Sequence, residues 1–138
     1  MGLEKEINDK GINKKLKTIY IGGGTPTSLN YNQLKKVLVL LKPYTNYIEE
    51  YTIEVNPETI NEDKIKLLKE YGINRVSVGV QSSDDRLLKI MNRHHDFNSV
   101  IHCINLFRKH NITNISVDIM YGLPFQTIND LDVTLNDV

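Results

Sequence analysis

The apolar residues of this chain recur with two alternating periods, and this alternation limits the folds that the chain can adopt. Short apolar runs of the strand type are separated by longer stretches in which apolar residues recur at helical spacing. The strand-like segments are residues 18–22, 51–55, 74–80 and 113–121. The helix-like segments are residues 31–42, 61–71, 84–91, 98–109 and 129–137. Strands that alternate with helices over short connections predict an α/β protein with a parallel sheet, either a barrel or an open doubly wound sheet.

Local signals mark the ends of two of these helices. Pro43 stands just after the 31–42 segment and is expected to stop that helix. Asn61 is the expected N-cap of the next helix, and acidic residues fill its first turn. Gly72 stands where this second helix should end.

The two ends of the chain bear on its domain organisation. Residues 3–7 resemble the tail of a helix that no strand precedes, and residues 129–138 begin a helix that nothing follows. Four parallel strands alone would leave both edges of the sheet open. Loose terminal turns would account for these ends, but a closed α/β barrel needs about 200 residues or more. We therefore expect residues 1–138 to be a piece of a larger domain.

The composition argues against several classes of protein. The 138 residues are 40% hydrophobic and 25% charged, as in a globular domain with a core. Lys and Arg number 17, as do Asp and Glu, and this balance argues against a dominant nucleic-acid surface. No apolar run approaches the roughly 20 residues that span a membrane. The charged N-terminus does not resemble a signal peptide, so the expected compartment is the cytoplasm.

Cysteine and histidine do not form a recognisable metal-binding pattern. The single cysteine, Cys103, rules out an internal disulfide and an all-cysteine metal site within this chain. Its place beside Ile104 in a helix predicts a small buried side chain. The four histidines lack the converging spacing, with carboxylate support, that metal sites usually show.

Polar or flexible residues stand at the carboxyl end of every strand-like segment, which is where parallel α/β sheets hold their sites. Residues 19–21 have the character of a buried strand, yet three glycines follow at once. Such a run indicates that something lies close to the backbone there. Arg93 follows the third strand and could lean over the same edge. The candidate site residues are Gly23, Gly24, Thr25, Glu54, Gln81, Arg93 and Asp118.

Each of these residues has a simpler explanation when taken alone. A glycine run is often only a tight turn, and Glu54 could be a solvated edge residue. Asp118 is harder to explain in this way, because it alternates with Val117 and Ile119 and a buried aspartate needs a partner. Together, the four strand ends predict a pocket for a polar, uncharged or zwitterionic ligand. The glycine run lacks the lysine of a P-loop and the spacing of a Rossmann fingerprint.

Four motifs occur in order along nearly the whole chain. They are "YIGGGTPTSL", "TIEVNPETI", "NRVSVGVQSSDDRLLKIMNRHH" and "NISVDIMYGLPFQT". Together they resemble the radical S-adenosylmethionine family of oxygen-independent coproporphyrinogen III oxidases and their close relatives, the haem chaperones (HemN and HemW). The resemblance runs from about Leu3 to the end of the chain. The combination of motifs is specific, whereas any one of them alone is weak.

The resemblance implies a partial (βα)6 barrel of the TIM type, to which this chain would contribute strands two to five. The carboxyl rim of such a barrel would hold S-adenosylmethionine beside a [4Fe-4S] cluster. Arg93 suits the carboxylate of this cofactor by its charge, whereas Asp118 and Gln81 suit ribose hydroxyls. The cofactor contacts that the resemblance implies are those of Gly23, Gly24, Thr25, Glu54, Gln81, Arg93 and Asp118. In this arrangement a side chain at either of the two glycines would push the cofactor away from the cluster.

The sequence departs from the family at the cluster. The family holds its cluster with a Cys-x3-Cys-x2-Cys loop ahead of the first helix, and neither that loop nor the last barrel unit is present. Cys103 matches no cluster position, and such clusters are held by cysteine thiolates. The cluster is therefore expected only in a complete parent protein. The chain alone is expected to hold no iron and to turn over no S-adenosylmethionine.

Three functions remain open. The chain would be the cofactor-binding part either of an oxidase that decarboxylates the propionates of coproporphyrinogen III, or of a chaperone that hands haem to other proteins. The stretch "DDRLLKIMNRHH" leans toward the chaperones. The third possibility is an inactive remnant, or a subunit that needs a second polypeptide to supply the cluster loop. The expected partners are S-adenosylmethionine and, in the parent, a porphyrinogen or haem, with no nucleic acid and no membrane span.

Overall fold

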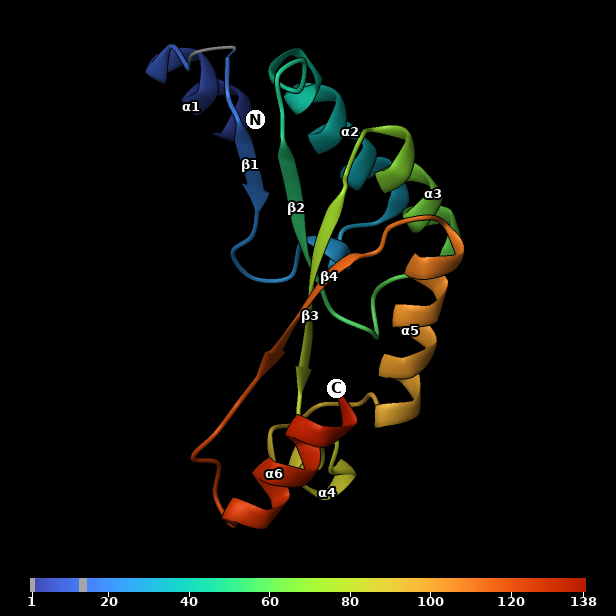
Figure 1. Cartoon of the computed structure of the whole chain (residues 1–138). Helices are drawn as coiled ribbons and strands as arrows, with labels where there is room; N and C mark the ends of the chain where they lie inside the picture. The colour runs from blue at the N-terminus through green and yellow to red at the C-terminus, as the bar shows by residue number, and fades with distance from the viewer. Residues whose placement is uncertain (1, 13–14) are drawn as a thin grey trace.

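Four parallel strands lie side by side in chain order in the computed structural model, which describes residues 2–12 and 15–138 (Figure 1). The strands are β1 (Thr18–Ile21), β2 (Glu50–Val55), β3 (Arg75–Gln81) and β4 (Asn114–Ile119). The predicted α/β class and parallel sheet are thus confirmed. The order β1-β2-β3-β4 has no reversal, whereas a doubly wound sheet requires one. The strand order is therefore that of a barrel wall.

The described residues also form six α-helices and two short 3-10 turns. The α-helices are α1 (Gly2–Lys10), α2 (Tyr31–Leu41), α3 (Glu62–Glu70), α4 (Asp85–Ile90), α5 (Phe97–Lys109) and α6 (Ile128–Asp137). The 3-10 turns are η1 (Pro26–Ser28) and η2 (Lys42–Tyr44). All the helices expected from the sequence are present. None of the described helices has both the length and the hydropathy of a membrane-spanning segment.

The helix ends follow the capping chemistry that the sequence indicates. The side chain of Asn61 accepts a hydrogen bond from the backbone N–H of Lys64 at 3.0 Å and so begins α3. Gly72, with a φ of +90°, ends the same helix in the left-handed conformation that glycine adopts at little cost. Pro43 lies in η2, directly after α2, and stops that helix as expected.

One face of the sheet is apolar and carries the core. The register aligns Ile53 of β2 with Val76 of β3, and Val76 with Ile115 of β4. Helices α2, α3 and α5 pack over this face (Figure 1). Buried members of the core include Leu34, Leu38, Tyr51, Ile53, Ile65, Leu68, Val76, Val78, Val100 and Phe107.

Cys103 of α5 belongs to this core. Its side chain is 2% exposed, and burial raises the pKa of its thiol to about 12. The predicted small buried side chain is thus confirmed. A thiol in this state is a poor nucleophile and a poor metal ligand.

The opposite face of the sheet is polar. The register aligns Glu54, Ser77 and Ser116 across three strands on this face. Parallel sheets usually bury both faces and so have continuously apolar strands, but these strands alternate. The prediction that residues 19–21 are buried is wrong for Tyr20, which is 55% exposed. The reason is that β1 is an edge strand in which the alternation turns Tyr20 to the polar face.

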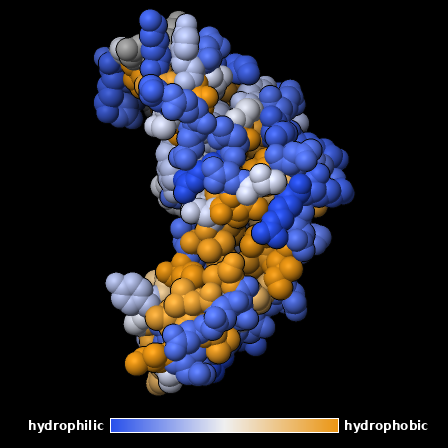
Figure 2. All heavy atoms as spheres, viewed as in Figure 1, coloured by the Kyte–Doolittle hydropathy of each residue, from blue (hydrophilic) through white to orange (hydrophobic). Residues whose placement is uncertain are grey.

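The chain leaves the sheet earlier than expected after β4. The predicted strand reaches residue 121, but β4 ends at Ile119, and Gly122 has a φ of +73°. The segment that follows exposes large apolar side chains, with Tyr121, Phe125 and Ile128 each 81% exposed. Apolar atoms gather on the surface around β4, α4 and α6 (Figure 2). The edge of β4 and this apolar surface are therefore exposed in the described chain.

Replacing Tyr51 with phenylalanine is expected to raise the free energy of unfolding by about 1 kcal/mol. The hydroxyl of Tyr51 is buried in the core, and no described residue pairs with it. Burial also raises the pKa of Tyr51 to about 12. Because folding strips this hydroxyl of its water partners without replacement, its removal should stabilise the fold. Urea unfolding measures the change. Tyr47→Phe, at a residue that is 61% exposed, should leave the value unaltered, and a less stable Tyr51→Phe protein would refute the assignment.

Glu62 joins the start of α3 to the end of α5. Its Oε1 accepts a hydrogen bond from Lys109 Nζ at 3.1 Å and lies 3.0 Å from His110 Nε2. The contacts with Lys109 and His110, together with the charge of Lys66, lower the pKa of Glu62 from 4.5 to about 2. The ionised carboxylate is therefore favoured in the folded chain.

This depressed pKa predicts a loss of stability in acid. Since the pKa of Glu62 is lower in the folded chain than in the unfolded chain, its contribution is complete above pH 4.5 and disappears as the pH falls toward 2. Melting temperatures of the wild type and of Glu62→Gln, measured between pH 2 and pH 7, should differ most at neutral pH and converge near pH 2. A difference that does not vary with pH would contradict this assignment.

Candidate functional site

A polar pocket of about 110 Å³ lies at the carboxyl ends of the four strands. Six of the seven predicted site residues line it, and the seventh, Gly23, donates a hydrogen bond from its N–H to Glu54 Oε2 at 3.2 Å. The sequence did not single out Asn56, Ser77 or Gly79 as site residues, although they also line the pocket. Its full lining is Gly24, Thr25, Glu54, Val55, Asn56, Ser77, Gly79, Gln81, Arg93 and Asp118. The structure therefore brings together residues from four strand ends and from the loop that follows α4.

The three glycines after β1 serve two different needs. A Cβ on Gly22 would lie 2.7 Å from Glu54 Oε1 and 2.7 Å from Tyr20 Cε1. Gly23 and Gly24 have φ values of +86° and +71°, and a Cβ on either would meet no described atom within 4 Å. The groups that crowd the backbone are therefore side chains of the protein itself, and they crowd Gly22. Gly23 and Gly24 are needed for the left-handed turn.

Glu54 links β2 to the tip of β1. Its Oε1 accepts a hydrogen bond from the Tyr20 hydroxyl at 3.0 Å, while its Oε2 accepts the bond from Gly23. Partial burial, and then the bond to Glu54, raise the pKa of Tyr20. Glu54 is thus an anchored residue of an inner strand rather than a solvated edge residue. Its carboxylate lies in the wall of the pocket.

Asp118 has a hydrogen-bond partner, as expected, but its side chain is not buried. Both of its carboxylate oxygens accept from the Ser77 hydroxyl, at 3.1 Å and 3.0 Å. The side chain is exposed, because β4 is an edge strand and Asp118 points to the polar face. A carboxylate oxygen has more than one lone pair, so Asp118 can accept further hydrogen bonds from a ligand.

A β-bulge aims Gln81 over the pocket. Gly79 pairs with Asp118 and Gln81 pairs with Ile119, which leaves Val80 as the extra residue of β3. Gln81 has a φ of +69°, which is uncommon for a residue other than glycine. A Cβ on Gly79 would lie 2.9 Å from Gln81 Nε2. The glycine therefore leaves room for the Gln81 side chain to fold back over the end of the strand.

A buried threonine anchors the glycine loop to the next loop of the rim. The Thr27 hydroxyl lies 2.6 Å from the Thr59 hydroxyl and accepts the backbone N–H of Asn56 at 3.2 Å. Lys64 donates to the carbonyl oxygens of Thr27 and Thr59, both at 2.7 Å, and burial lowers the pKa of Lys64. Sequence reasoning missed this anchor, since a lysine in an amphipathic helix gives no sign that it points to two carbonyls.

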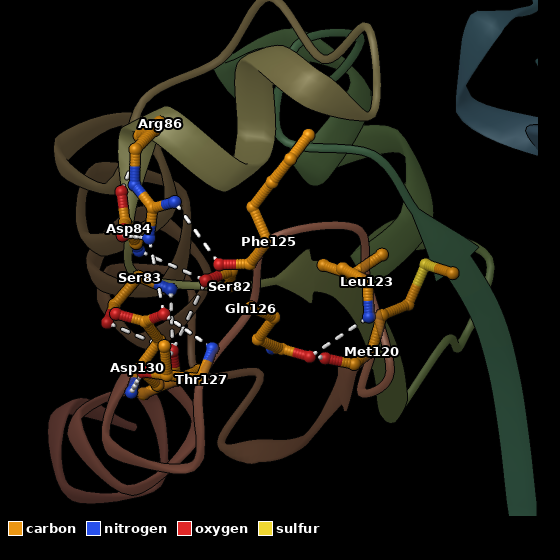
Figure 3. A network of polar contacts seen from close by, with 11 residues as sticks. Ser82, Ser83, Asp84, Arg86, Met120, Leu123, Phe125, Gln126, Thr127 and Asp130 are labelled. Carbon is orange, nitrogen blue, oxygen red and sulfur yellow. Dashed lines mark hydrogen bonds and ion pairs between the residues drawn. The ribbon is translucent and has the colours of Figure 1, made fainter.

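A second polar network ties α6 to the loop after β3 (Figure 3). The hydroxyls of Ser82 and Thr134 are fully buried and lie 3.3 Å apart. Ser83 donates its backbone N–H to Thr134 Oγ1 at 3.2 Å. Arg86 donates to Asp130 Oδ2 at 3.2 Å. These contacts hold α6 beyond the carboxyl end of β3, next to α4.

The side chains that commonly bind metal ions are dispersed in the described part of the chain. Within residues 2–12 and 15–138, no three His, Cys, Asp or Glu side chains are grouped so that they could hold a metal ion. His110 contacts Glu62 at the end of α5, and His95 contacts Glu58. Both histidines are thus engaged with a carboxylate.

The sequence and the fold are both similar to known proteins. Residues 3–138 match the family model of the radical SAM superfamily. The chain is 44% identical to the heme chaperone HemW of Bacillus subtilis over an alignment of 125 positions, which covers 88% of this chain and 33% of that protein. It is 33% identical to the oxygen-independent coproporphyrinogen III oxidase of Salmonella typhimurium over an alignment of 141 positions, gaps included, which covers 99% of this chain and 31% of that protein.

Among solved structures, the chain resembles the coproporphyrinogen III oxidase HemN of Escherichia coli, a radical SAM enzyme. The TM-score is 0.79 at 33% identity, over 88% of this chain and 29% of that chain. The predicted TIM-like architecture is confirmed by this match. The chain spans about a third of the length of these relatives.

Proposed function

The chain belongs to the radical SAM superfamily, and on that basis we propose that its rim pocket binds S-adenosylmethionine. The observation that carries this proposal is the convergence of the predicted residues on a single polar pocket at the carboxyl ends of the strands. In the parent protein this part would serve an enzyme like the oxygen-independent coproporphyrinogen III oxidases. We further propose that residues 1–138 correspond to strands two to five of that barrel.

The chemistry of the pocket suits a zwitterionic nucleoside. Arg93 supplies a cation for the carboxylate of the methionine group. Glu54 and the backbone of Gly24 and Thr25 would bind its ammonium group. Asp118 and Gln81 supply a carboxylate and an amide for the ribose hydroxyls. With a reduced iron–sulfur cluster beside it, S-adenosylmethionine supplies the radical chemistry of this superfamily.

The residues of this chain do not fit an iron–sulfur cluster. Such clusters are held by cysteine thiolates, and the sequence contains one cysteine. Cys103 is buried in α5 on the apolar side of the sheet, with a raised pKa. The ligands of a cluster would therefore have to come from cysteines outside these 138 residues.

Calorimetric titration of the iron-free chain tests the proposal. We expect S-adenosylmethionine to bind, and methionine or adenosine alone to bind more weakly, because each occupies only one end of the pocket. Thermal unfolding provides a second measure, since a ligand at about 100 times its Kd stabilises the fold by about 2.7 kcal/mol. The proposal fails if neither method detects binding, or if adenosine binds as tightly as the full cofactor.

A haem chaperone is the second candidate for the parent protein. The chain is more similar in sequence to the Bacillus subtilis chaperone, at 44% identity, than to the Salmonella oxidase, at 33%. Haem titration of the chain, followed by the Soret band, distinguishes the two candidates. A shifted band that saturates at one haem per chain would favour the chaperone. A folded chain that binds neither haem nor S-adenosylmethionine would favour the inactive form.

A further inference from the structure

Arg93 is the one predicted site residue that does not belong to a strand or to the glycine turn. It lies in the irregular segment between α4 and α5, just after Asn92, whose φ is +57°. Its backbone N–H donates to Leu88 O at 2.9 Å, which fixes the turn at the end of α4. Within the described residues, no side chain or carbonyl group pairs with its guanidinium. The position of this segment over the pocket therefore depends on contacts of residues other than the Arg93 side chain.

Glu58 holds the segment directly. Its Oε1 accepts three hydrogen bonds: from His94 N at 2.9 Å, from His95 N at 3.0 Å, and from His95 Nδ1 at 3.0 Å. Burial opposes the ionisation of Glu58, but the bonds from His95 and His94 outweigh it, and the pKa of Glu58 lies below its ordinary value. The anchor is therefore a carboxylate that binds the two residues directly after Arg93.

The contact of His95 with Glu58 leaves a polar atom of the His95 ring buried without a partner, which is unfavourable for folding. Its side chain is fully buried, and its Nε2 has no hydrogen-bond partner in the described chain. Nδ1 faces Glu58, so the other ring nitrogen, Nε2, is the one that is buried without a partner. A leucine or a methionine would fill the same space without this cost. What His95 provides that those side chains would not is the contact of its ring with Glu58.

The same carboxylate links two loops of the rim. Glu58 lies in the loop after β2, and its own N–H donates to the side chain of Asn56, a residue of the pocket wall. Through Glu58, the loop that carries Asn56 and the loop that carries Arg93 are fixed relative to each other. The distance between the β2 end of the pocket and Arg93 therefore depends on this carboxylate.

We propose that Glu58 and His95 are positioning residues, which hold the Arg93 guanidinium at the rim so that it meets the carboxylate of the bound ligand. This inference rests on the proposed binding of S-adenosylmethionine. Glu58 and His95 would affect only the end of the ligand that carries the carboxylate. The affinity for a ligand without this carboxylate should therefore not depend on them. Because Glu58 would act on binding through Arg93, the effects of substituting these two residues should not be additive.

The test compares S-adenosylmethionine with decarboxylated S-adenosylmethionine by calorimetry. Glu58→Ala is expected to weaken S-adenosylmethionine about tenfold and to leave the decarboxylated ligand unchanged. In an Arg93→Ala background, Glu58→Ala should produce no further loss. Glu62→Ala is the matched control, because Glu62 also pairs with a histidine but lies outside the pocket lining. If Glu58→Ala does not fold, Glu58→Gln, which keeps a weaker acceptor in place, carries the same comparison with an expected loss of about threefold.

A ligand-free measurement separates this proposal from the proposed function. The NMR order parameter of the Arg93 Nε–H in the 15N-labelled chain should fall in Glu58→Ala and stay unchanged in Glu62→Ala. If the wild type does not bind S-adenosylmethionine, the proposed function fails, and the order parameter still decides the positioning role. An unchanged order parameter, or an equal loss of affinity for both ligands, would overturn the proposal and leave Glu58 as a stabilising residue only.

Discussion

Asp118→Ala will weaken the binding of S-adenosylmethionine by the chain about 10- to 100-fold, because a hydrogen bond to a charged group contributes about 1.5–3 kcal/mol. The exposed carboxylate of Asp118 is held by Ser77 and retains lone pairs for a ligand. The substitution removes that acceptor and also leaves the Ser77 hydroxyl without its partner. Calorimetric titration at neutral pH measures the loss.

Asn114 provides the control for this substitution. It lies on the same strand and the same face as Asp118 but at the opposite end of β4, outside the pocket. Asn114→Ala should bind S-adenosylmethionine like the wild type, and Asp118→Asn should fall between the two. Equal affinities for the wild type and Asp118→Ala would show that Asp118 has been assigned the wrong role.

Phe107→Ala will lower the free energy of unfolding by about 3–5 kcal/mol, the largest loss of stability that we expect from a single substitution in this chain. Phe107 lies in α5 with no exposed surface and packs in the core on the apolar face of the sheet. The polar face offers no second core to compensate for the cavity. Urea unfolding followed by circular dichroism measures the effect.

Ile101 tests whether the effect comes from burial rather than from the helix. It lies in α5 as well but is 44% exposed. Ile101→Ala should therefore change the free energy of unfolding by no more than about 0.5 kcal/mol. A loss below 1 kcal/mol for Phe107→Ala would show that the core relaxes around the site, and that α5 contributes less than its burial indicates.

The fold was largely predictable, because the periodicity of the apolar residues and the residues that cap the helices are both local signals. The switch between strand and helix periods located all four strands, and Asn61 and Gly72 marked the ends of α3. The exposure of Tyr20 and Asp118 was not predictable in this way, since it depends on which strands lie at the edges of the sheet. A single-sequence pattern specifies alternation but not which neighbour covers a face.

The candidate site was predictable in position and less so in detail. Strand ends with polar residues identified the rim, and the structure brings those residues together. The crowding of Gly22 by Glu54 and the bond from Lys64 to Thr27 arise from contacts across 32 and 37 positions in the chain, which no local signal reports. The cofactor roles of the seven residues, the extent of the domain and the cytoplasmic location stay predictions.

The division of this sheet into an apolar face and a polar face has an evolutionary consequence. Substitutions at Ser116 or Asp118 change the chemistry that faces a ligand and remove little packing, because these side chains are not part of the core. Folding and recognition are thus encoded at alternate positions of the same strands. New specificities could arise on one side of the wall by mutation and selection while the other side keeps the protein folded.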